Sequence, residues 1–204
     1  MPKIVDAQAR RREVAQAVQR VVSRAGSLEA ASLRNVAAEA GLAIGSVRHY
    51  FTDHTELLTF AMEDLGRRIG RRVRERAEPL LHPAVDLDRR ALTEELFAEL
   101  LPLDDTRHQE AALWLAFTTA ARTRPELRPC ARELQEGLRT LIGQVLAEAR
   151  RMGGVPQRLD AELESLRLAA LLDGLTLQAV LYPGLVTATE MRRVLRRQLD
   201  QLTR

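Results

Sequence analysis

The stretch from Leu33 to Thr52 constrains the fold of this 204-residue chain more than any other segment. It reads LRNVAAEAGLAIGSVRHYFT, with apolar residues at helical spacing on both sides of a glycine. Gly41 favours a turn, because glycine adopts a left-handed backbone at the end of a helix with the least strain. The pattern predicts two short helices set at an angle, and the second is of the kind that lies in a DNA major groove.

The small and apolar residues of this hairpin all fit the same arrangement of two packed helices. Val36, Ala37 and Ala40 fall on one face of the first helix, and Ala37 is small enough for the second helix to cross close above it. Leu42 and Val47 are expected beneath the turn. An ordinary helical hairpin with a glycine turn is the alternative, but the agreement of these positions favours DNA binding.

The ends of the hairpin complete the pattern. Ser32 precedes the first helix as an N-cap does, and Tyr50 and Phe51 are expected to anchor the second helix to the core. The residues left on the outward face of the second helix are Gly45, Ser46, Arg48 and His49.

Residues 6–70 resemble the N-terminal domain of the tetracycline-repressor (TetR) family of transcriptional regulators. Three runs carry the resemblance, namely Val36–Leu42, Gly45–Phe51 and Asp53–Leu58. The family consists mostly of all-helical homodimers that repress promoters and release DNA when a small molecule fills the C-terminal domain. The resemblance therefore implies double-stranded operator DNA, a small-molecule effector and a second copy of the chain as partners.

An all-α fold of about nine helices is expected. It would consist of an N-terminal three-helix helix-turn-helix domain, residues 1–53, and a C-terminal helical ligand-binding and dimerisation domain, residues 54–204. Pro79, His82 and Pro83 predict a break after the fourth helix. Besides the hairpin, helices are expected at about 6–24, 54–76, 88–101, 106–123, 125–152, 160–182 and 187–204.

Local capping signals support these helix ends. Gly26 is expected to close the first helix, and Pro129 would be tolerated only in the first turn of its helix. Two capping boxes are predicted, one formed by Asp53 and Glu56 and one by Thr187 and Glu190.

The composition restricts the class of protein. Residues 1–76 hold 14 Lys and Arg against 9 Asp and Glu, which concentrates a charge of +5 around the hairpin and fits attraction to phosphates. No run of about 18 uncharged apolar residues occurs and the N-terminus lacks a signal-peptide core, so a cytoplasmic protein without membrane contact is expected. Cys130 is the single cysteine, so no intramolecular disulfide is possible.

The resemblance implies which residues contact DNA. Arg48 is the expected base reader, because its guanidinium can form a bidentate pair with guanine that contributes about 1–3 kcal/mol of discrimination. Ala43 stands where many members of the family have serine, and His54 where many have lysine. Plain surface histidines are the alternative for His49 and His54. The expected DNA contacts are Ser32, Arg34, Ile44, Gly45, Ser46, Arg48, His49, Tyr50 and His54, and Arg10, Arg11 and Arg12 could add charge at the groove edge.

The last two helices are expected to form a dimer interface. Pairing of both helices across a two-fold axis would give a four-helix bundle and place two recognition helices about one DNA turn apart. The alternative is that these helices only complete the core of one chain. The segment Leu172–Gln178 also resembles the C-terminal domain of the BetI-like branch of the family. The predicted interface residues are Leu171, Leu175, Ala179, Val194, Leu195 and Leu199.

An effector pocket is expected among the fourth to eighth helices. Aromatic residues are more often plain core than pocket wall, and Trp114 and Phe117 are favoured because Thr118 adds a polar group at helical spacing. Asp173 could face a cationic ligand, or it could form a cap or hydrogen bond at the dimer interface. The candidate pocket residues are Phe60, Phe97, Trp114, Phe117, Thr118, Asp173 and Leu177.

An enzyme is not expected. The sequence has no phosphate-binding loop, no His or Cys cluster at metal-ligand spacing and no plausible catalytic triad, so no catalytic residue, metal site or cofactor is predicted. The alternative to a DNA-binding regulator is a dimeric ligand-binding or scaffolding protein without operator binding.

Overall fold

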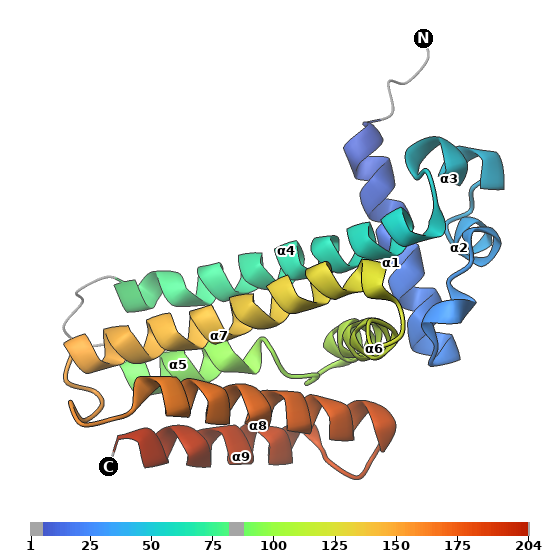
Figure 1. The fold of residues 1–204 in the computed structure, drawn as a ribbon. Coiled ribbons are helices and arrows are strands. Elements are labelled where there is room, and N and C mark those ends of the chain that lie inside the picture. Colours follow the sequence, from blue (N-terminus) through green and yellow to red (C-terminus); the bar gives the residue numbers. More distant parts are fainter. Residues whose placement is uncertain (1–5, 82–87, 204) are drawn as a thin grey trace. The chain divides into compact units, whose positions relative to one another are not determined.

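The computed structural model describes residues 6–81 and 88–203, which form nine α-helices and two short 3-10 helices (Figure 1). These residues divide into two compact units. The described part of unit 1 lies within residues 1–68 and 109–132, and that of unit 2 within 69–108 and 133–204. The elements are α1 (Ala7–Ala25), η1 (Leu28–Ala30), α2 (Leu33–Glu39), α3 (Ile44–Tyr50), α4 (His54–Leu81), α5 (Arg89–Ala98), α6 (Asp105–Ala120), η2 (Pro125–Leu127), α7 (Arg128–Arg151), α8 (Ala161–Leu181) and α9 (Ala188–Leu202).

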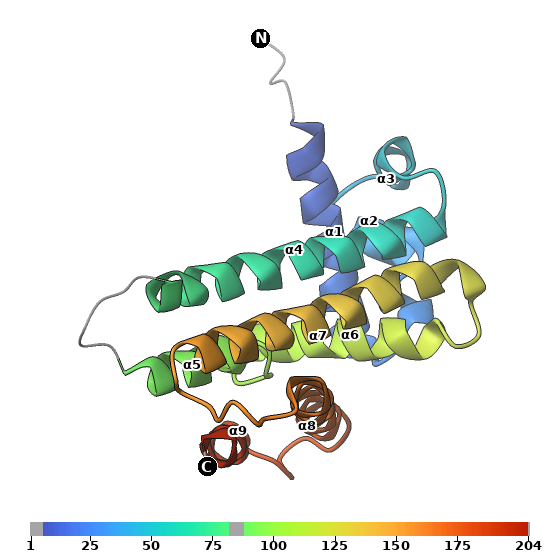
Figure 2. The ribbon, with the colours of Figure 1, turned by 60° about the vertical axis from the view of Figure 1, so that its left-hand side comes forward.

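Unit 1 contains the helix-turn-helix. Figures 1 and 2 show α2 and α3 set at an angle to each other beside α1. The apolar stripe of α1, which includes Val14, Val18 and Val22, is fully buried. Val36 and Val47 are also fully buried, so the hairpin packs through the apolar positions that define its sequence pattern.

Unit 2 has an apolar core built from the second half of α4 together with α5, α7, α8 and α9. Leu96, Phe97 and Leu168 are fully buried in it, as is Leu195 of α9.

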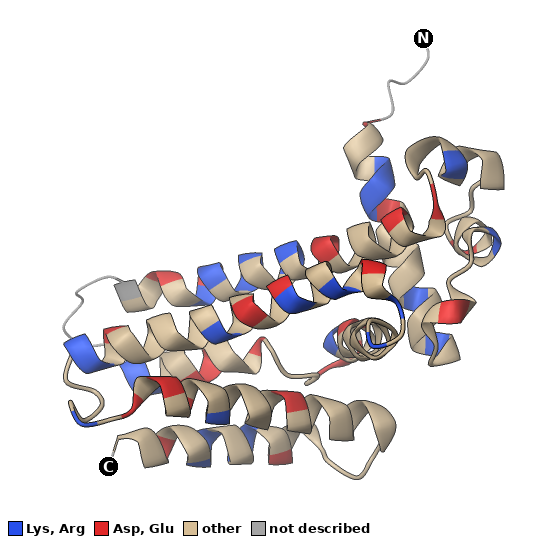
Figure 3. Ribbon diagram, viewed as in Figure 1, with Lys and Arg blue, Asp and Glu red and all other residues tan. Residues whose placement is uncertain are grey.

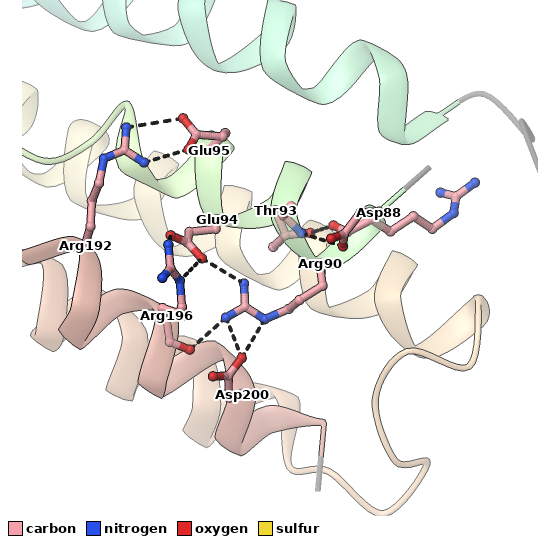
Figure 4. A network of polar contacts seen from close by, with 10 residues as sticks. Asp88, Arg90, Thr93, Glu94, Glu95, Arg192, Arg196 and Asp200 are labelled. Carbon is pink, nitrogen blue, oxygen red and sulfur yellow. Dashed lines mark hydrogen bonds and ion pairs between the residues drawn. The ribbon is translucent and has the colours of Figure 1, made fainter. Parts of the chain in front are cut away.

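Polar contacts also tie α9 to α5 (Figure 4). The buried carboxylate of Glu94 accepts hydrogen bonds from Arg196 at 2.9 and 3.0 Å, while Arg90 donates to Asp200 at 2.7 Å. Because Glu94 is buried with two charged donors around it, removing either donor would leave a poorly solvated carboxylate. One face of α9 is therefore bound to α5 of the same chain through these ion pairs and hydrogen bonds.

Most helix ends follow the predicted capping signals. The side chain of Asp6 caps α1, and Gly26 ends it with φ +68°. The capping box of Thr187 and Glu190 is complete, with both reciprocal hydrogen bonds present. Pro129 lies in the first turn of α7, where its missing N–H costs no helical hydrogen bond.

Two local predictions were wrong, and one short element was not predicted. Helix α4 continues through Pro79 to Leu81, beyond the expected end near Arg76. The capping box at Asp53 is only half formed: Asp53 accepts the Glu56 amide at 2.8 Å, but the Glu56 carboxylate accepts from Thr52 instead of Asp53. The short helix η1 was not expected. His82 and Pro83, the other predicted helix breakers, lie outside the described residues.

Across 6–81 and 88–203, none of the helices combines the length and the apolar character that crossing a membrane requires. The compact units group the described residues by contacts, so the proposed functional division between residues 53 and 54 stays a prediction.

Candidate nucleic-acid interface

The turn between α2 and α3 has the backbone that its sequence predicts. Gly41 has φ +65°, a conformation that strains other residues. The amide of Gly41 donates to the Ala38 carbonyl at 3.2 Å, and the amide of Leu42 donates to the Ala37 carbonyl at 2.9 Å. These bonds satisfy carbonyls at the end of α2 and fix the direction in which the chain enters α3.

Helix α3 presents a polar and largely exposed outer face. Ile44, Gly45, Arg48 and His49 are exposed, and Ser46 is half-buried. Arg48 has no hydrogen bond or ion pair with any residue in the described ranges, so its five donors are available. Arg48 is the one Lys or Arg of α3, and the helix has no Asp or Glu; Figure 3 accordingly shows α3 with basic but no acidic colouring. The face is chemically suited to a partner rich in acceptors and negative charge.

The predicted contacts at the edges of α3 have local structural roles as well. Ser32 is the N-cap of α2 as predicted, because its side chain accepts the Asn35 amide at 3.2 Å. Ala43 provides no side-chain cap for α3, in agreement with its departure from the family pattern. Arg34 is exposed, while Tyr50 is half-buried and contacts the His49 ring at 5.2 Å between centroids.

His54 is tied to the helix-turn-helix by its ring. Its Nε2 lies 2.9 Å from the carbonyl oxygen of Ala31, the residue before the cap of α2. Since a carbonyl only accepts, Nε2 carries the hydrogen in this contact and Nδ1 is the nitrogen left over. This geometry gives His54 a structural partner, and a phosphate contact through His54 stays a prediction.

The three arginines at the start of α1 have acidic partners in the chain. Arg10 pairs with Glu13 at 2.5 Å, and Arg12 lies 3.8 Å from the Asp6 carboxylate. Arg11 pairs with Glu56 at 2.8 Å. Of the three, Arg12 has the most exposed side chain, and its ion pair is the longest.

The candidate pocket residues are distributed over both units. In unit 1, Phe117 is fully buried and Trp114 half-buried. The Thr118 hydroxyl donates to the Trp114 carbonyl at 2.9 Å, so its hydrogen is used within α6. Phe60 packs edge-on against Phe51 and belongs to the corner between α3 and α4.

In unit 2, Phe97 is fully buried in the core and Leu177 is 40 % exposed. Asp173 is half-buried and accepts a hydrogen bond from the Gln135 amide at 3.1 Å. Burial raises the pKa of the Asp173 carboxyl above its ordinary value, and the bond from Gln135 offsets only part of this. Gln135 is neutral, and no described residue forms an ion pair with Asp173. The carboxylate charge therefore has no cationic partner among the residues that the structure describes.

The predicted interface residues fall into two groups. Ala179, Leu195 and Leu199 are buried in the core of their own unit, so they are covered before any partner binds. Leu171 and Val194 are partly exposed and line a groove of about 720 Å³ between α8 and α9, together with the buried Leu175.

Helix α8 has an exposed apolar face whose leucines were not predicted as site residues. Leu177 is the exception, since it was a candidate for the effector pocket. Leu163, Leu166 and Leu181 are each about half exposed and follow helical spacing along one side of α8. The available signal was the sequence of α8, which is apolar almost all round. Periodicity alone could not separate the side facing the core from the side facing outward.

No group of three or more potential metal ligands occurs among residues 6–81 and 88–203.

Comparison with known proteins agrees with this architecture. Residues 89–204 match the family described as "BetI-type transcriptional repressor, C-terminal". The chain is 34 % identical over 203 residues to the HTH-type transcriptional regulator PksA of Bacillus subtilis, covering 99 % of this chain and 94 % of PksA. It is 32 % identical over 183 residues to the regulator BetI of Cronobacter sakazakii, covering 89 % and 84 % of the two chains.

Solved structures have the same fold. A transcriptional regulator from Rhodococcus sp. Rha1 superposes with a TM-score of 0.79 at 30 % identity, covering 94 % of this chain and 95 % of the other. A regulator from Saccharomonospora viridis in complex with choline gives a TM-score of 0.76 at 22 % identity, with coverage of 96 % and 97 %.

Proposed function

We propose that this chain, which belongs to the TetR family of transcriptional regulators and has a BetI-type C-terminal domain, is a homodimeric repressor released from its operator by a small molecule. It is a transcriptional regulator and not an enzyme. The cytoplasm is the location we propose, since a regulator of this type acts where the chromosome is.

The observation that carries operator binding is the free guanidinium of Arg48 on the outer face of α3. The buried side chains behind α3, Val47 and Phe51, hold the helix against unit 1, so the exposed side is presented on a fixed support. Arg48 would read a guanine, while Ser46 and His49 beside it would contact base edges or phosphates. Ser32, Arg34 and Tyr50 would hold the neighbouring backbone.

The experiment that tests operator binding is a fluorescence titration of the full-length protein with DNA from upstream of its own gene. A random duplex of equal length is the control, and both titrations are repeated over a range of salt concentrations. We expect preference for the upstream DNA and an affinity that falls linearly with salt on logarithmic axes. Absence of binding at low salt to any tested upstream segment would instead favour a dimeric ligand-binding or scaffolding protein.

We propose that the exposed side of α8, with the groove beside α9, is the dimer interface. Leu163, Leu166, Leu177 and Leu181 form one apolar stripe that no described residue of the chain covers. An isologous contact places the same stripe on both partners, so each copy would cover the other's leucines. The groove contributes Leu171 and Val194, with Arg193, Arg197 and Glu190 at its rim for polar contacts.

We propose that the effector carries a positive charge that Asp173 recognises. A half-buried carboxylate with a raised pKa and a neutral hydrogen-bond partner is stabilised when a cation lies beside it. The structural relative from Saccharomonospora viridis binds choline, which makes a quaternary ammonium a sensible first probe.

The charge of the effector is tested with two probes of nearly equal shape. Choline has a quaternary nitrogen, and 3,3-dimethyl-1-butanol replaces that nitrogen with carbon. We expect choline, but not the alcohol, to raise the melting temperature of the protein, and Asp173→Asn to remove most of the shift. Equal shifts for both probes, or for wild type and the variant, would show that Asp173 does not recognise a cation.

A further inference from the structure

We propose that Arg11 is a positioning residue for the recognition helix and holds the corner between α3 and α4 without contacting DNA. The inference rests on the proposed operator binding. Arg11 is one of the three arginines that could add charge at the edge of the DNA groove, and its contacts give it a different role.

The guanidinium of Arg11 lies against two aromatic rings at this corner. Its central carbon is 4.6 Å from the ring centroid of Phe51 and 4.4 Å from that of Phe60. The two rings meet edge to face, with centroids 5.5 Å apart. Phe51 is the C-cap of α3 and Phe60 lies in the second turn of α4, so one side chain from α1 joins the end of one helix to the beginning of the next.

A chain of hydrogen bonds links the same three elements. Arg11 donates to one oxygen of Glu56 at 2.8 Å. The other oxygen of Glu56 accepts the backbone amide of Thr52 at 2.7 Å and its hydroxyl at 2.9 Å. Thr52 is the first residue after the cap of α3. These bonds from Thr52, followed by the pair with Arg11, keep the pKa of Glu56 below its ordinary value.

The contacts at the C-terminal end of α3 are important for its orientation, because its N-terminal end has no side-chain cap. Ala43 forms no side-chain cap, and α3 has only seven residues. A helix this short has little stability of its own. Its orientation therefore depends on burial of Val47 and on the contacts that Arg11 and Glu56 make at its exit.

The guanidinium of Arg11 is poorly available to a phosphate, because its charge and its faces are already engaged within the chain. Its side chain is 24 % exposed, and its Nε is buried without a hydrogen-bond partner among the described residues. Stacking on two rings explains why this nitrogen is shielded, and the Glu56 pair neutralises the charge. A base or phosphate contact would require the guanidinium to leave both partners.

Glu56→Gln tests the proposal through the sign of its effect. Removing a negative charge near DNA strengthens binding if electrostatics alone matter. If the Arg11–Glu56 contact orients α3, operator affinity should instead fall, by about threefold, while affinity for random DNA stays equal or rises. Glu63→Gln is the matched control, because Glu63 is another acid of α4 with an arginine partner, 3.7 Å away, and its side chain is more exposed than that of Glu56. It should leave operator affinity unchanged.

Arg11→Lys tests the planar group, since lysine keeps the charge but cannot stack its head group on two rings. We expect about a tenfold loss of operator affinity, with random-DNA affinity and its salt slope unchanged. Arg67→Lys is the control, because Arg67 lies 5.2 Å from the Phe60 centroid but is more exposed. Urea unfolding of every variant separates lost orientation from lost folding.

Two results would overturn the proposal. Wild-type operator affinity in both Glu56→Gln and Arg11→Lys would show that the corner does not orient α3. An Arg11→Met variant whose affinities for operator and random DNA fall together, with a salt slope smaller by about 0.9, would show a phosphate contact. Absence of operator binding by the wild-type protein would overturn the proposed function, and with it this proposal, which rests on that function.

Discussion

Helices α3 and α8 both present an exposed face, and the two faces are chemically opposite. The outer face of α3 carries Arg48, His49 and a glycine, whereas that of α8 carries leucines at helical spacing. A short polar face fits a groove lined with acceptors and phosphates, where water and ions are exchanged for hydrogen bonds. A long apolar face is costly in water and is stabilised by another protein surface. The two faces therefore suit two different kinds of partner, a nucleic acid at α3 and another protein surface at α8.

The largest expected effect comes from placing a charge in the α8 face. A Cβ atom added at Gly174 meets nothing within 4 Å, so the backbone accommodates a side chain there and Gly174→Arg should fold. We expect a monomer by analytical ultracentrifugation and a loss of operator affinity of about 100-fold or more, since each subunit then binds its half-site alone.

Gly137→Arg is the control for this variant, because Gly137 is also a helical glycine with open space around it. It lies on α7, and no residue of α7 is part of the interface proposed on α8 and α9. A Gly174→Arg protein that remains a dimer, or a Gly137→Arg protein that dissociates as readily, would contradict the assignment of α8.

A smaller effect is expected on the polar face of α3. Arg48→Ala removes a bidentate donor, so operator affinity should fall by about 10- to 100-fold, equivalent to about 1–3 kcal/mol, with the dimer intact. Titrations with single base substitutions in the operator show which base pair loses its preference. If Arg48→Ala discriminates the same bases as the wild type, Arg48 is not a reader of sequence.

The smallest effect concerns two carboxyls whose pKa values shift in opposite directions. The pKa of Glu56 is lowered, so its contribution to stability is present above its ordinary pKa and is lost as pH falls through the lower folded-state value. Glu56→Gln should therefore be less stable than wild type at neutral pH, and the difference should shrink in acid.

Asp173 should behave in the opposite way in the same urea titrations. Its raised pKa means that the charged form is unfavourable in the folded protein above that pKa, and acid relieves this cost. Asp173→Asn should be at least as stable as wild type at neutral pH, and any gain should vanish in acid. A neutral-pH loss for Asp173→Asn that persists in acid would contradict this assignment.

Local signals in the sequence were enough to predict most of the fold. Asp6, Gly26 and Thr187 define helix ends through their own backbone geometry, and such effects need no knowledge of the tertiary structure. The hairpin was predictable for the same reason. Pro79 misled because a proline near the end of a helix removes only one backbone hydrogen bond, which the rest of α4 tolerates.

The less predictable features depend on contacts distant in sequence. Arg11 and Glu56 are 45 positions apart, and nothing in either local pattern indicates that they meet. Leu195 and Leu199 fit an apolar stripe equally well whether it faces a partner or its own core, and the structure places them in the core. The residues proposed for the effector remain proposals, since aromatic and acidic residues fit pocket and core alike.

The missing side-chain cap at Ala43 has a consequence for the dynamics of α3. A helix of two turns without an N-terminal side-chain cap frays more readily than α1, which Asp6 caps. In the free protein, amide hydrogens of α3 should therefore exchange with deuterium sooner than those in the centre of α1. If operator DNA binds this face as proposed, it should slow that exchange, and part of the binding free energy would then go into ordering the uncapped first turn of α3.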